Sequence, residues 1–271
     1  MPDSAAVPGS TPPSPRLTVV GNALHDLPAD LRLALTRLRV GLLKALGDDL
    51  VCLVAYGSAT RPDRPRHRGD VDTHGVLRVA PDPEAATRIE QVHDAIAAEF
   101  GIEWDSWYIL ERDARRPEPP SHALRRDLVD RSWSLHRAHW LAGEYILLHG
   151  SPAAELVPPP TWPELEAGLR GEAASILREL AAGRDDAPFA AYAVANACRI
   201  LYSITSRDVV VSKRAALSWG RAHLPETWAP AIESAERVSD GDELAGDAQA
   251  VRAHLGEIIA AAELACARPA G

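Results

Sequence analysis

The chain has 271 residues and a formal net charge of −9. This length can bury a large core and favours two domains. The acidic balance argues against a general grip on a nucleic-acid backbone, which requires a basic surface, so we expect no nucleic-acid partner. No apolar run is long enough to span a membrane, and the N-terminus lacks the pattern of a secretory signal. The three cysteines are far apart and form no C-x-x-C pair, which suits the reducing cytoplasm that we expect as its location.

The N-terminal region divides into a tail, a helix and a strand. Residues 1–16 are rich in Pro and Ser, which predicts a disordered tail. Leucines at helical spacing predict an amphipathic helix over residues 28–46. The apolar run at residues 51–56 then predicts a buried strand.

This strand is followed by two short polar motifs. Gly57 and Ser58 come first, where the glycine lets the backbone approach a ligand and the serine offers a hydroxyl and an N–H to phosphate oxygens. Asp70 and Asp72 then open a second strand, and alternation places them on one side, roughly 7 Å apart along the chain. Two carboxylates this close repel each other, and a bound divalent cation removes that penalty.

The order of apolar strand, Gly-Ser and, after eleven residues, D-x-D resembles the signature of the DNA polymerase beta-type nucleotidyltransferase superfamily. The resemblance implies that Gly57 and Ser58 hold a nucleoside triphosphate and that Asp70 and Asp72 bind Mg²⁺. The intervening loop carries four arginines. These are Arg61, Arg64, Arg66 and Arg68. Either all four belong to a solvated basic loop, or one of these arginines approaches the triphosphate.

A helix is predicted over residues 83–100 and a further strand over residues 102–110. Alternation places Glu103, Asp105 and Trp107 on one face of that strand. In the nucleotidyltransferase superfamily a third carboxylate comes from the strand beside the D-x-D strand. The resemblance favours Asp105, with Glu103 as the alternative, either to accept a proton from an attacking hydroxyl or to complete the metal shell. Trp107 either lines the acceptor side or serves as a core or edge aromatic.

The rest of this half predicts a helix over residues 124–141 and a strand over residues 145–149. Gly150 and Ser151 repeat the Gly-Ser pair, but no acidic pair follows, so we assign them a structural role. Four histidines show no metal-ligand spacing and are expected to be structural or at the surface: His74, His122, His136 and His139.

A proline run at residues 157–160 marks the expected domain boundary. We predict a tail at 1–16, a nucleotidyltransferase domain at 17–157 and a helical domain at 158–271. The fold class is therefore α+β, with an N-terminal mixed sheet and flanking helices and a C-terminal α-helical bundle. The helix over residues 188–206 is apolar on most sides and should be central in the bundle.

Four short stretches of the second half, 196–203, 211–213, 216–219 and 224–225, resemble the C-terminal domain of aminoglycoside adenylyltransferases of the streptomycin and spectinomycin 3″(9) type. The resemblance implies that Arg199 and Lys213 hold the ATP phosphates. A charge within an apolar helix needs a partner of opposite charge. If Arg199 or Lys213 does not bind the ATP phosphates, the alternative is that it pairs with an acidic side chain of the protein. The turn at residues 206–208 is one residue longer than usual in that family, so Arg207 could share the task of Lys213.

Asp185 and Asp186 precede the central helix. They either offer anions to an amine or guanidinium of a substrate, as the resemblance implies, or cap the helix ahead of Pro188. No Trp occupies the position of the family's aromatic drug contact.

Together the resemblances imply a Mg²⁺-dependent enzyme that transfers AMP from ATP to a hydroxyl of an aminoglycoside or aminocyclitol antibiotic. We expect a cationic small-molecule substrate, a monomer and no membrane partner. The alternatives are another small-molecule or protein hydroxyl as acceptor, or a non-catalytic nucleotide-binding relative.

Overall fold

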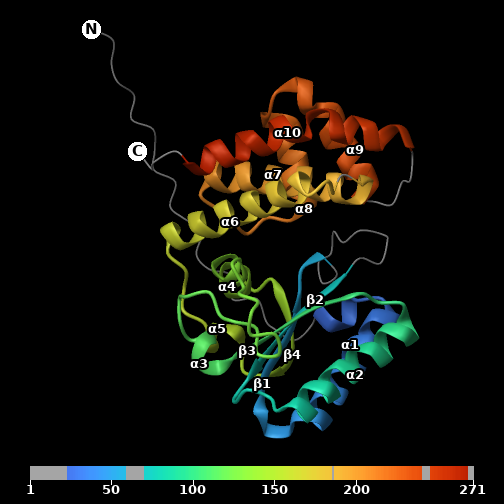
Figure 1. Cartoon of the computed structure of the whole chain (residues 1–271), viewed down its shortest axis with the longest axis vertical. Helices are drawn as coiled ribbons and strands as arrows, with labels where there is room; N and C mark the ends of the chain where they lie inside the picture. Colours follow the sequence, from blue (N-terminus) through green and yellow to red (C-terminus); the bar gives the residue numbers. More distant parts are fainter. Residues whose placement is uncertain (1–22, 59–69, 185, 240–244, 268–271) are drawn as a thin grey trace.

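The computed structural model describes residues 23–58, 70–184, 186–239 and 245–267 (Figure 1). The predicted tail at 1–16 and the arginines of the loop at 59–69 lie outside these ranges. The described helices and strands, in chain order, are η1 (Ala23–Asp26), α1 (Ala29–Leu46), η2 (Gly47–Asp49), β1 (Leu50–Tyr56), β2 (Val71–Leu77), α2 (Pro83–Phe100), β3 (Trp104–Leu110), α3 (Glu111–Ala114), α4 (Trp133–Leu141), β4 (Tyr145–Gly150), α5 (Ala153–Leu156), α6 (Trp162–Ala181), α7 (Ala187–Ser206), α8 (Lys213–His223), η4 (Glu226–Trp228), α9 (Ala229–Ser239) and α10 (Ala245–Ala267).

Within the described ranges, the N-terminal half forms a four-stranded mixed sheet in the order β3-β2-β1-β4. β1 pairs antiparallel with both β2 and β4, whereas β2 and β3 are parallel. The parallel pair requires a crossover, which α2 provides. Thr73 of β2 and Ser106 of β3 are register partners whose hydroxyls lie 2.7 Å apart, so the two strands are also joined by their side chains.

Alternation along β1 sends its side chains into apolar clusters on opposite faces of the sheet. Leu53 and Ala55 pack with leucines of α1 and with Ile89 of α2. Cys52, Val54 and Tyr56 pack on the other face with residues of α4 and α5, including Trp133 and Trp140. Figure 1 shows α1 and α2 on one side of the sheet and α3, α4 and α5 on the other. The sheet is therefore covered on both faces, and its strand ends are left for polar groups.

The second half is helical, as predicted, with α7 at its centre. Most of α7 is buried, and it packs in one cluster with side chains of α6, α8, α9 and α10. Leu135 of α4 belongs to the same cluster. Arg137 of α4 is fully buried and pairs with Glu164 of α6, so the two halves also meet through charged groups.

One predicted helix is wrong over its first half. Residues 124–141 were expected to be helical, but α4 begins only at Trp133. Nδ1 of His122 accepts the backbone N–H groups of Leu124 and Arg125 at 3.1 and 3.2 Å, which gives this backbone an alternative to helical hydrogen bonds. The segment before α4 is thus a loop that lies beside the sheet.

Among the described helices, none has the length and apolar character needed to span a bilayer.

Candidate active site

Three carboxylates converge at the start of two neighbouring strands. Oxygen atoms of Asp70, Asp72 and Asp105 all lie within 4.8 Å of one another. Asp72 and Asp105 are register partners in the parallel β2–β3 pair, and Asp70 immediately precedes β2. Register partners project to the same face, and residues two apart on a strand do so as well. The geometry of the sheet therefore brings these three carboxylates together.

Glu103, the alternative third carboxylate, lies just before β3. Its backbone carbonyl accepts the N–H of Val71 at 2.9 Å. Of the two candidates, Asp105 is the one whose carboxylate joins the Asp70 and Asp72 pair in the part of the chain that the structure describes. The catalytic and metal-binding roles of these residues stay predictions.

The electrostatics of the cluster favour a cation. Burial, followed by the neighbouring Asp70 and Asp105, raises the pKa of Asp72 to about 7. Burial and Asp70 also raise the pKa of Asp105. The three ionised carboxylates destabilise one another, and a divalent cation would relieve that repulsion. Carboxylate oxygens are the ligands that Mg²⁺ and other hard cations prefer, so the donor set fits the predicted metal.

Gly57 is required by the position of Asp72. Its φ is +76°, a left-handed conformation that costs other residues energy. A Cβ at this position would overlap Oδ2 of Asp72 and lie 2.8 Å from its Cγ. Gly57 therefore makes room for a carboxylate of the cluster, in addition to its predicted place in the phosphate-binding turn. Ser58 follows it at the partly exposed end of the turn.

One cationic side chain of the helical half, Lys213, is electrostatically coupled to the cluster. Lys213 is the first residue of α8, and its Nζ lies 4.6 Å from the ring centroid of Tyr192. Burial and Arg199 lower the pKa of Lys213, whereas Asp70 and Asp72 act in the opposite direction. Lys213 is thus an electrostatic neighbour of the carboxylates, although it follows Asp72 by more than half the chain.

Arg199 points from α7 toward α4. Its Nη1 donates to Oδ1 of Asn196 at 3.2 Å, and its Nη2 lies 3.3 Å from Nε2 of the buried His139. It also lowers the pKa of Lys213, so the two cations face a shared region. Such a pair is suited to a polyanion, which would offset their mutual repulsion.

Other predicted ligands have different neighbours. The guanidinium of Arg207 lies 5.1 Å from the ring centroid of Trp162. Asp186 is the N-cap of α7 and accepts the N–H of Phe189 at 2.9 Å, which is the capping alternative proposed for it. Asp185 lies outside the described residues.

Trp107 is partly buried on β3 and packs against two histidines. Its ring centroid lies 6.5 Å from that of His74, in a stacked arrangement, and 5.0 Å from that of His122. These contacts match the core or edge alternative. Its side chain shares the strand face of Asp105, as alternation predicts.

Two of the four histidines lie together with an aspartate in the folded chain. His74 of β2 and His136 of α4 meet at Asp130, which belongs to the loop that was predicted to be helical. Oδ2 of Asp130 lies 3.5 Å from Nε2 of His74 and 2.9 Å from Nδ1 of His136. Sequence spacing does not reveal this group, because its members come from three separate segments. The one local signal is that His74 follows Asp72 by two residues and so shares its face.

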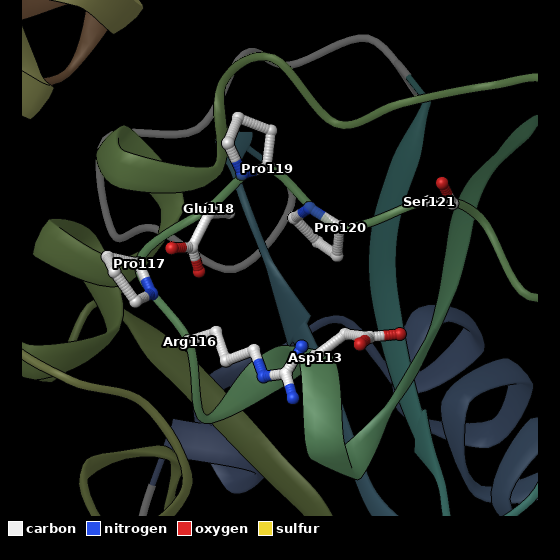
Figure 2. Close-up of a pocket in the computed structure, with 7 residues that line it drawn as sticks. All are labelled: Asp113, Arg116, Pro117, Glu118, Pro119, Pro120 and Ser121. Carbon is white, nitrogen blue, oxygen red and sulfur yellow. The ribbon is translucent and has the colours of Figure 1, made fainter.

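A pocket of about 450 Å³ lies elsewhere, on the loop between β3 and α4 (Figure 2). It is lined by Asp113, Arg116, Pro117, Glu118, Pro119, Pro120 and Ser121. Buried side chains tie its backbone to the interior, since Trp133 donates to the carbonyl of Arg116 at 3.2 Å and Arg137 to that of Pro117 at 3.3 Å. None of the three clustered carboxylates lines it, so it is separate from the candidate site.

The comparisons with known proteins agree on both halves of the chain. Residues 173–261 match the family model described as "Aminoglycoside adenylyltransferase, C-terminal domain". The fold resembles the crystal structure of spectinomycin adenyltransferase AAD(9) from Enterococcus faecialis with ATP and spectinomycin. The TM-score is 0.70 and the sequence identity 12%, over 87% of this chain and 99% of that chain. No curated protein sequence matches significantly. The structural match confirms the predicted fold class. The family model supports the predicted resemblance over residues 173–261.

Proposed function

We propose, from the match of residues 173–261 to the model of aminoglycoside adenylyltransferase C-terminal domains, that the chain is an adenylyltransferase. It transfers AMP from ATP to a hydroxyl group of an aminoglycoside or aminocyclitol. The observation that carries the proposal is the convergence of Asp70, Asp72 and Asp105 within 4.8 Å. The structurally similar AAD(9) was crystallised with ATP and spectinomycin, which supports the same pair of substrate classes here.

In this proposal the three carboxylates hold Mg²⁺, which when bound neutralises phosphate charge and orients the α-phosphate for in-line attack. Gly57 and Ser58 offer backbone and hydroxyl groups to the triphosphate from the sheet side. Arg199 and Lys213 meet it from the helical side. The nucleotide is thus held between the two halves, with its negative charge matched by groups from both.

Asp105 is proposed as the general base. The acceptor hydroxyl loses its proton to Asp105 as its oxygen attacks the α-phosphorus, the bond to the bridging oxygen breaks, and pyrophosphate leaves. Asp105 is suited to this role because its carboxylate lies beside Asp70 and Asp72, where the α-phosphate would be held.

A cationic acceptor fits the charge of the site and of the chain. Beyond the carboxylate cluster, the net charge of −9 gives a mild attraction for amines and guanidinium groups. We propose that the protein acts as a monomer and that the unit 17–157 supplies the carboxylates while the unit 158–271 supplies the cations.

The proposal is tested with purified protein, Mg-ATP and a panel of aminoglycosides and aminocyclitols. Pyrophosphate release is measured, and products are examined for one added adenylyl group by mass spectrometry. We expect turnover with at least one drug and its loss in Asp72→Asn, whereas Asp94→Asn, an exposed acid on α2, should keep activity. Absence of turnover with every drug, or full activity of Asp72→Asn, would refute it. An adduct formed only with cell extract would redirect the proposal to another acceptor.

A further inference from the structure

A second group of potential metal ligands lies beside the three carboxylates. It consists of His74, Asp130 and His136, whose candidate ligand atoms all lie within 4.8 Å of one another. His74 is fully buried, Asp130 is 3% exposed, and the side chain of His136 is 22% exposed. The proposed adenylyl transfer does not use any of the three residues.

The ring of His74 is unusual because both of its nitrogens are buried and, among the described residues, neither has a hydrogen-bond partner. A buried polar atom left unpaired destabilises the folded state. Aromatic rings surround this histidine, with ring centroids of Tyr56 and Trp140 at 5.2 and 5.0 Å. The rings offer it no strong acceptor, and the nearest acidic oxygen, Oδ2 of Asp130, lies 3.5 Å from Nε2, at the outer limit of a hydrogen bond.

We propose that His74, Asp130 and His136 bind one divalent transition-metal ion of the Zn²⁺ type. Two imidazoles and one carboxylate form a common ligand set for zinc. Tetrahedral ligands with bonds of about 2.1 Å lie roughly 3.4 Å apart. The separations of 3.5 Å and 2.9 Å from Oδ2 of Asp130 bracket this value, so small side-chain movements are sufficient. The metal would also give the unpartnered nitrogen of His74 a ligand bond.

This site differs in chemistry from the carboxylate cluster. Three carboxylates favour a hard cation such as Mg²⁺, whereas imidazole nitrogen favours zinc, cobalt and nickel. The two sites share strand β2, where Asp72 and His74 lie roughly 7 Å apart on one face. A metal at the histidine site would join β2 to α4 and so hold the strand that carries Asp72. Three protein ligands leave a fourth tetrahedral position for water.

Metal content tests the proposal directly. Protein made without a polyhistidine tag is stripped with a chelator, incubated with Zn²⁺ or Co²⁺ and freed of excess metal. We expect one equivalent of zinc by mass spectrometry and a visible Co²⁺ absorption band. The doubly substituted Asp70→Asn/Asp105→Asn protein, which lacks two acids of the other cluster, should retain both signals. His149→Gln, a histidine of β4 outside the group, should retain them as well.

His136→Gln should no longer retain one equivalent of zinc after excess metal is removed. Its affinity for zinc should be weaker by about tenfold or more, because the loss of an outer-shell partner alone has an effect of that size. Circular dichroism confirms that this variant is folded. X-ray absorption of the zinc-loaded wild-type protein gives a second measurement that needs no variant and should show two imidazole ligands. Equal zinc binding by wild type and His136→Gln, no binding by either, or a shell of oxygen ligands alone would overturn the proposal.

Discussion

Replacing Gly57 by alanine tests the link between the turn and the carboxylate cluster. The new Cβ would overlap Oδ2 of Asp72, so this carboxylate must rotate away. The left-handed backbone costs an alanine about 1–2 kcal/mol, and the stiffer unfolded chain offsets about 0.4–1 kcal/mol of this. We therefore expect a free energy of unfolding lower by about 1 kcal/mol. Displacing a catalytic group by about 1 Å can cost about 100-fold in rate, so we expect kcat to fall on that order.

The matched control is Gly171→Ala in α6. A Cβ there meets no atom within 4 Å, and the helical backbone suits alanine. It should raise the free energy of unfolding by about 0.5–1 kcal/mol and leave kcat unchanged. Urea unfolding, pyrophosphate release and Mg²⁺ titration calorimetry are measured for both variants. If Gly57→Ala keeps the wild-type kcat and Mg²⁺ affinity, the inference that Gly57 positions Asp72 is wrong.

Three further predictions follow from the charges. The pKa of Asp72 is raised to about 7 in the folded state, so the folded protein binds this proton more tightly than the unfolded chain does. The resulting stabilisation is complete below the unfolded-state pKa of Asp72 and is lost as the pH rises through the folded-state value. The Tm of metal-free protein should therefore fall between pH 5 and pH 8 more than that of Asp72→Asn, and Mg²⁺ should restore it; equal pH profiles for both proteins would contradict this. Lys213→Met should raise the KM for ATP about 10- to 100-fold, as expected for a lost charge-assisted bond, whereas its exposed neighbour Arg214→Met should leave the KM unchanged. Asp186→Ala should cost about 1 kcal/mol in urea unfolding and Asp186→Asn almost nothing; a raised drug KM in the stable Asn variant would show that the carboxylate also contacts substrate.

Much of the architecture follows from local patterns along the chain. Leucine spacing predicted α1, and apolar runs predicted β1 and α7. Alternation placed Asp70, just before β2, and Asp72, within it, on one side. Such patterns are local because helix and strand periods act over a few residues. They also predicted both possible roles of Asp186, and the structure shows the capping one.

The tertiary structure decided which distant groups meet. Alternation put Glu103 and Asp105 on one face, and only the β2–β3 register made Asp105 the partner of Asp72. The segment before α4 has a helical pattern but forms a loop, because the ring of His122 accepts its backbone N–H groups. This loop places Asp130 beside His74. Contacts between segments tens of residues apart depend on strand pairing and helix packing, which no local period encodes. For this reason the sequence alone determined the helices and strands and the polar residues at their ends. The tertiary structure determined which carboxylates and histidines share a site.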